Sequence, residues 1–259
     1  MKTRRSRLLG TMVAVMVASV LSMSGCAVVP REFPPSGANE PDVVAAREEA
    51  AAAQGELLAN AAMGEVISEG VQDYCRSGSY SEPWGPRDPY YWSCGHVTSW
   101  VVGTDSEDPG ELIAAYRAHL ASIGCEPSEA DFDMTAQYWE MYGVSGQNAN
   151  GDRYTVDNLP SASARCPDGA GIGIGFRSAA EFDASTLVTY YAGDGEQITD
   201  QPHDQAAVRA SGRALVVTLW TSTTYHDVPR GGSEPSPETT PEPERCACYS
   251  GSECECPGG

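Results

Sequence analysis

Apolar side chains recur at helical spacing in two stretches of the chain. In residues 41–69, which are rich in Ala, Glu, Leu and Val, the residues that can share one helix face are Val44, Ala51, Leu58, Ala62 and Val66. Further on, Asp108-Pro109-Gly110-Glu111 has the order of a helix start, and an apolar face of Leu112, Tyr116, Leu120 and Ile123 ends at Gly124. The pattern predicts a long helix over residues 41–69 and a capped helix that begins at Pro109.

Elsewhere, β-branched and aromatic residues gather in short runs bounded by turn-forming residues, which is typical of strands. These runs are residues 96–103, 171–177, 186–191 and 214–225. Residues 136–144 and 153–159 flank a turn segment at 147–152 and predict a β-hairpin, and residues 199–212 have room for a short helix or an irregular crossing. Two helices with about six mostly antiparallel strands predict an α+β fold, in which the helices pack on the sheet.

One of these runs, Gly171-Ile172-Gly173-Ile174-Gly175, alternates glycine with large apolar residues. The dinucleotide-binding fingerprint needs its third glycine further along and a helix beginning there, so this run lacks the spacing of a phosphate loop. In a strand, Ile172, Ile174 and Phe176 face the core. The glycines then leave the opposite side bare for the close approach of an aromatic ring or a helix.

The N-terminus has the layout of a secretory signal, with basic residues before an apolar run. The basic residues are Lys2, Arg4, Arg5 and Arg7. The run over residues 8–23 is short for a membrane-spanning helix. It leads into Leu21-Ser22-Met23-Ser24-Gly25-Cys26, where an apolar residue and small residues stand before a cysteine.

Residues 21–26 resemble the lipobox of bacterial lipoprotein precursors, and the resemblance extends over residues 1–26 only. It implies that residues 1–25 are a cleaved signal peptide and that the thiol of Cys26 receives a diacylglycerol. Acyl chains such as palmitate then anchor the exported protein on the extracytoplasmic side of a membrane. A plain cleaved signal and a retained membrane helix are the alternatives, and export by the general or the twin-arginine route stays open.

Composition divides the rest of the chain into three parts. Residues 26–40 are rich in Pro and Gly and read as a lipid-anchored linker. Residues 41–228 carry the predicted elements and form the α+β domain. Residues 229–259 are rich in Pro and Glu, poor in apolar residues, and are expected to be a disordered tail that ends in a cluster of cysteines.

The charge balance excludes several classes of partner. The chain has 36 acidic against 16 basic residues and a formal net charge of −20, and no lysine follows Lys2. Nucleic acid is excluded because phosphate binding requires clustered Lys and Arg. A direct electrostatic hold on anionic lipid is excluded for the same reason, so attachment to a membrane must come from the lipid anchor.

Eight cysteines besides Cys26 fall into two sets. The first set is Cys75, Cys94, Cys125 and Cys166, and the second is Cys246, Cys248, Cys254 and Cys256. In an oxidising compartment cysteines pair, and we favour Cys75 with Cys94 and Cys125 with Cys166, although three connectivities are open. The second set is expected to form disulfides within the tail, with metal capture or attachment to another molecule as alternatives.

Aromatic residues concentrate between Tyr74 and Trp100. Besides those two, the region holds Tyr80, Trp84, Tyr90, Tyr91 and Trp92. Such rings suit stacking on a sugar or holding a peptide, and a disulfide-stapled loop would pre-organise them. They are therefore a candidate binding patch, and the alternative is a small satellite core.

No catalytic or metal-binding spacing is found in the sequence. The four histidines are far apart in the sequence and lack zinc-site spacing: His96, His119, His203 and His226. The spacing of oxygen ligands in a calcium loop is found at Asn148, Asn150 and Asp152, but Arg153 stands where such a loop has its turn glycine. No cofactor is implied. We expect a non-catalytic, lipid-anchored cell-envelope protein that binds a wall glycan or an envelope protein. A secreted hydrolase with a spatially assembled site and a structural spacer are the alternatives.

Overall fold

The computed structural model describes residues 34–78, 88–187 and 195–230. The predicted signal peptide, Cys26, Tyr80, Trp84 and the four tail cysteines lie outside the described residues. Residues up to Pro35 form a unit separate from the one that begins at Ser36. The fold described below is that of the second unit.

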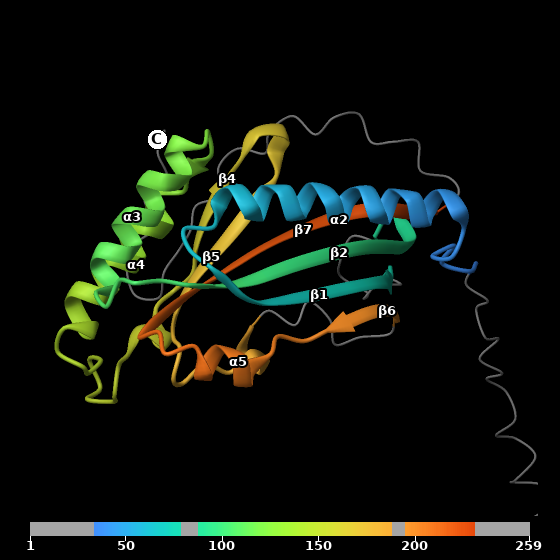
Figure 1. The fold of residues 1–259 in the computed structure, drawn as a ribbon. Coiled ribbons are helices and arrows are strands. Elements are labelled where there is room, and N and C mark those ends of the chain that lie inside the picture. The colour runs from blue at the N-terminus through green and yellow to red at the C-terminus, as the bar shows by residue number, and fades with distance from the viewer. Residues whose placement is uncertain (1–33, 79–87, 188–194, 231–259) are drawn as a thin grey trace, which may run out of the picture. The chain divides into compact units, whose positions relative to one another are not determined.

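Seven strands of the described residues form one antiparallel sheet, which confirms the predicted α+β class (Figure 1). They are β1 (Val66–Ser77), β2 (Tyr90–Gly103), β3 (Glu126–Pro127), β4 (Ala162–Arg165), β5 (Gly171–Ser178), β6 (Gly195–Gln201) and β7 (Leu215–Pro229). The order across the sheet is β3-β4-β5-β7-β2-β1-β6, and each pair is antiparallel. The long central strands β7 and β2 therefore join residues from both halves of the chain.

Helices lie on both faces of this sheet. The α-helices are α2 (Pro41–Ala61), α3 (Pro109–Ser122), α4 (Glu129–Tyr138) and α5 (Gln205–Ala210). A π-helix, η1 (Trp139–Gly143), extends α4, and short 3-10 turns lie at η2 (Val156–Asn158), η3 (Pro167–Gly169) and η4 (Ala184–Thr186). Figure 1 shows α2, α3 and α4 on one face and the short α5 on the other. Within the described part of the chain, most of the second face thus has no helix over it.

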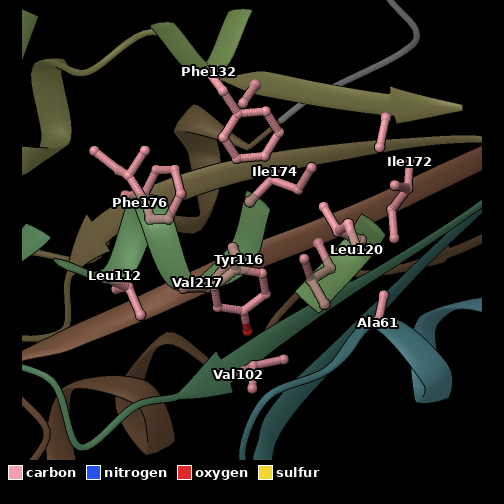
Figure 2. Close-up of a cluster of buried hydrophobic side chains, with 14 of the residues drawn as sticks. Ala61, Val102, Leu112, Tyr116, Leu120, Phe132, Ile172, Ile174, Phe176 and Val217 are labelled. Atoms are coloured by element: carbon pink, nitrogen blue, oxygen red, sulfur yellow. The ribbon is translucent and has the colours of Figure 1, made fainter. Parts of the chain in front are cut away.

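The main core fills the space between the sheet and the three longer helices (Figure 2). Ile174 and Phe176 of β5 meet Tyr116 of α3 and Phe132 of α4, and all four are fully buried. The rings of Tyr116 and Phe176 pack edge to face with centroids 6.2 Å apart. The Tyr116 hydroxyl accepts a hydrogen bond from the Met63 amide, and its burial raises the pKa of Tyr116 to about 12.

The helix predicted to begin at Pro109 is confirmed. The Asp108 carboxylate accepts a hydrogen bond from the Gly110 amide at 2.7 Å, so one of the free amides of the first turn is satisfied. At the other end, Gly124 has φ +86°, the left-handed conformation that commonly follows a helix. Both ends are therefore determined by residues next to them in the sequence.

Two other elements differ from the prediction. The helix expected over residues 41–69 ends at Ala61, because Gly64 interrupts it and the β-branched Val66 and Ile67 begin β1. The run at 186–191 contributes no strand within the described residues: η4 ends at Thr186, and residues 188–191 lie outside them.

The hairpin predicted from residues 136–144 and 153–159 is wrong. Residues 129–143 are α4 and η1, because Ser128 caps the helix and Phe132, Ala136 and Trp139 turn to the core at helical spacing. Residues 147–152 do form a turn, in which the Asn148 carboxamide oxygen accepts amide hydrogens from Asn150 and Asp152. A single bridge between Gln147 and Arg153 is the only strand-like pairing there.

Both favoured disulfides of the domain are present. Cys75 and Cys94 face each other across β1 and β2, and Cys125 is joined to Cys166. Beside the first bridge, Ser36 and Ala38 are buried although they fall in the predicted linker. The Ala38 carbonyl accepts a hydrogen bond from Arg47 at 2.6 Å, so the packed domain begins before α2.

Candidate functional site

The face of the sheet opposite the main core is hollowed. A cavity of about 370 Å³ lies over β1, β2 and β7 beside α5, and a second hollow of about 760 Å³ lies over β4 and β5. Both are lined by Trp220 and Ser161. An apolar cluster that includes Phe182 and Val208 fills the remaining space under α5. Because no helix of the described residues covers this part of the sheet, its side chains form a candidate ligand surface.

Trp220 occupies the centre of this surface. It stands opposite Gly173 in the β5–β7 register, and a Cβ atom on Gly173 would overlap Cε2, Cζ2 and Nε1 of its indole. The ring therefore lies over the bare backbone of β5. The glycines of residues 171–175 were predicted to leave one side of the strand bare for an aromatic ring or a helix. This prediction is confirmed, and the ring is that of Trp220.

A chain of hydrogen bonds crosses the floor of the 370 Å³ cavity. His203 Nε2 lies 2.8 Å from Ser99 Oγ, and His203 Nδ1 lies 3.2 Å from Ser68 Oγ, which accepts the Asp204 amide. The ring rests on β1 at Gly70, where a Cβ would be 2.7 Å from Nε2. Burial lowers the pKa of His203 to about 4, so the imidazole is neutral at physiological pH.

One assignment of the hydroxyl and imidazole protons gives every donor of this hydrogen-bond network an acceptor. Ser68 donates to His203 Nδ1, Nε2–H donates to Ser99, and the Ser99 hydroxyl donates to the Gly70 carbonyl at 3.3 Å. In that tautomer His203 cannot accept the Ser99 proton. The group positions Ser99 and leaves a lone pair of its oxygen to accept a ligand donor.

Arg177 supplies the positive charge of the cavity. It comes from the end of β5, and its Nη1 donates to the Phe176 carbonyl at 2.8 Å. No carboxylate of the described residues forms an ion pair with it. Burial lowers the pKa of the guanidinium, and the nearby negative charge of Asp157 partly opposes this. A half-buried, unpaired guanidinium is expensive to maintain without a function for its charge.

The candidate aromatic patch lies elsewhere. Tyr90, Tyr91 and Trp92 begin β2 and are half-buried, whereas Tyr80 and Trp84 lie outside the described residues. Trp92 packs on the cluster of Ala38, Cys75 and Cys94. The guanidinium of Arg230 lies 5.5 Å from the ring centre of Tyr91, and that of Arg76 lies 5.6 Å from the ring centre of Tyr90. For the described rings, these contacts agree with the alternative of a small satellite core.

A second polar cluster lies under α2, on the core side of the sheet. Asp73 is 1% exposed, receives a hydrogen bond from the Tyr225 hydroxyl at 2.7 Å, and lies 2.6 Å from Arg47 Nε. Alongside it, Gln54 and His96 exchange two hydrogen bonds of 2.9 Å. Arg47 and Asp73 pair with each other and link α2 to β1, so the cluster holds α2 to the sheet.

The remaining histidines stay apart. His119 contacts the Asn60 carbonyl near the end of α3, and His226 lies on β7. Within the residues that the structure describes, no three potential ligands converge as a metal site, and no helix has the length and apolar character to cross a membrane.

Sequence reasoning missed Trp220, Arg177 and the pairing of Ser99 with His203. The alternating glycines were a usable signal for an aromatic neighbour, but only the strand register shows that this neighbour is Trp220. Comparison of the chain with family models, curated proteins and solved structures gives no match. The functional argument therefore depends on the site alone.

Proposed function

We propose that this protein is a lipid-anchored component of the bacterial cell envelope that binds a wall glycan on the face of its sheet opposite the main core. One observation carries the ligand-binding part: Trp220 lies on a glycine floor between two hollows, with Ser99 and Arg177 beside it. A flat indole next to hydrogen-bonding groups is the combination that binds sugar rings. The cavity has the volume of a small-molecule site.

The location in the envelope is supported by the lipobox-like residues 21–26 and by the disulfides, which suit an oxidising compartment. Because the chain is strongly acidic, the lipid is its sole hold on a membrane under this proposal. Cys26→Ala should move the protein from the membrane fraction to the soluble exported fraction. Retention of the variant in the membrane would contradict the anchor.

Ligand binding is tested by calorimetric titration of the full chain with soluble glycan fragments released from bacterial wall. Trp220→Ala should abolish the heat of binding. The matched control is Tyr138→Ala, which removes an aromatic ring 41% exposed on α4, away from the cavity. Undiminished binding by Trp220→Ala would place the site elsewhere, and absence of binding by the unaltered chain would refute the proposed ligand.

Hydrolysis is a second candidate because a serine oxygen lies 2.8 Å from a histidine nitrogen in a cavity. It ranks second for two reasons. A His203 with a pKa of about 4 is a weak base, and Ser68 stands where a carboxylate would orient the imidazole. A fluorophosphonate probe separates the two: stoichiometric labelling of Ser99, absent in His203→Asn, would establish the hydrolase.

A further inference from the structure

The cavity contains one guanidinium beside one aromatic ring, and their relative placement restricts the ligand. A Cβ atom built on Gly175 would lie 3.6 Å from Arg177 Nη2 and 3.5 Å from Trp220 Cζ3. The guanidinium and the edge of the indole therefore lie next to each other above the same glycine. A ligand that uses both must carry its anionic group on, or one short substituent away from, its ring.

The charges that line the cavity favour an anion with a single charge. Arg177 is its one cationic side chain among the described residues, since His203 is neutral at physiological pH. The carboxylate lining the cavity, Asp200, is exposed on β6, where water screens it. A chain with net charge −20 disfavours a doubly charged phosphate more than a carboxylate, and one guanidinium fork matches one carboxylate.

We infer that the group bound in this cavity is a carboxylate-bearing sugar, whose ring stacks on Trp220 and whose carboxylate pairs with Arg177. The inference rests on the proposed function and specifies the chemical class of its ligand. Hydroxyl or amide hydrogens of the sugar donate to Ser99, whose own proton is committed to Gly70. The acid then supplies the ion pair that Arg177 does not form with any carboxylate of the described residues.

The test uses two sugars that differ in the acid. N-acetylmuramic acid carries a lactyl carboxylate on the ring of N-acetylglucosamine, and both are titrated into the full chain by ligand-observed NMR. A charge-assisted pair with a partly buried guanidinium should make the acidic sugar bind roughly 10- to 100-fold more tightly. N-acetylglucosamine 6-phosphate is the third probe.

Two variants connect this preference to Arg177. Arg177→Gln should bind both sugars as weakly as the unaltered chain binds N-acetylglucosamine, and Arg177→Lys should recover part of the preference. The matched control, Arg153→Gln, removes an exposed guanidinium paired with Glu181 outside the cavity and should keep the full preference. Comparison of the sugars in the unaltered chain does not depend on any variant folding.

The outcomes distinguish failure of the inference alone from failure of the proposed function. Equal binding of the two sugars, still lost in Trp220→Ala, would overturn the carboxylate and leave the glycan site standing. Tighter binding of the phosphate sugar than of N-acetylmuramic acid would also overturn the carboxylate. Binding of none of the three probes would overturn the inference together with the glycan ligand.

Discussion

Replacement of Gly173 by alanine tests directly whether Trp220 depends on the glycine floor. β5 is held on both sides, with Gly173 opposite Ser163 of β4 and Trp220 of β7. The backbone therefore cannot retreat from an added methyl group, and the indole must leave its position. Overpacking of this kind costs about 1 to 3 kcal/mol. For a domain of this size that is a fall of roughly 2 to 12 °C in Tm.

Gly171→Ala is the matched control. It lies on the same strand and the same side, but a Cβ there meets no atom within 4 Å. The control should be neutral or more stable by about 0.4 to 1 kcal/mol, because alanine reduces the freedom of the unfolded chain. Both variants are measured by thermal unfolding followed by near-ultraviolet circular dichroism, which reports the tryptophan environment.

A double variant completes the experiment. If the clash with the indole causes the loss, Gly173→Ala should cost far less in a Trp220→Ala background, which gives a coupling energy of about 1 kcal/mol or more. Equal stability of Gly173→Ala and Gly171→Ala, with an unchanged tryptophan signal, would refute the packing of Trp220 on this strand.

Three further predictions concern stability. Replacing Cys125 and Cys166 with serine should lower the free energy of unfolding by about 4 kcal/mol in urea, since the bridge spans 41 residues; no loss would show that the bridge does not constrain the chain. Because the pKa of His203 falls from 6.5 to about 4 on folding, stability should drop as the pH falls through this window, by at most about 1.4 kcal/mol per pH unit, and His203→Asn should remove that part of the slope. Asp73→Ala should cost about 3 kcal/mol or more in the same assay, whereas Asp105→Ala, whose pair with Arg213 is exposed, should cost less than about 1 kcal/mol; equal costs would contradict the buried pair.

Elements with local signals were predictable from the sequence. The helix at Pro109 has its cap, its apolar face and its terminating glycine within a short stretch, and the structure reproduces each. Both disulfides of the domain agree with the favoured pairing, which joins the first cysteine of the set to the second and the third to the fourth along the chain. β5 was found because its alternation with glycine fits no helix.

Failures occurred where local preference and tertiary packing disagree. Tyr138, Trp139 and Val144 have strand propensity and suggested a hairpin, but Phe132 and Trp139 bury the helical face of this segment. β1 was missed because Ser68, Gly70 and Gln72 give its outward face no apolar side chain. Gly70 and Gln72 line the cavity, and Ser68 contacts His203. In the stretch that forms the site, β1 therefore lacks the apolar residues that would have predicted a strand.

The site itself could not be predicted from sequence alone. Ser99 and His203 are 104 residues apart in the sequence. Ser99 is on β2, whereas His203 is in the segment that joins β6 to α5, so the two meet only once the sheet is assembled. Gly173 and Trp220 meet through one register of β5 on β7, and a shift of one residue would turn the indole into the core. Such pairings depend on strand order, which the sequence pattern does not encode locally.

The most direct test of the binding face is the set of indole N–H resonances in the NMR spectrum of the full chain. The chain has five tryptophans, and loss of one resonance in Trp220→Phe assigns that residue. On addition of N-acetylmuramic acid, we predict that the Trp220 resonance shifts while that of Trp92 stays in place. A shift of Trp92 with Trp220 unchanged would move binding to the aromatic residues at the start of β2 and contradict the site.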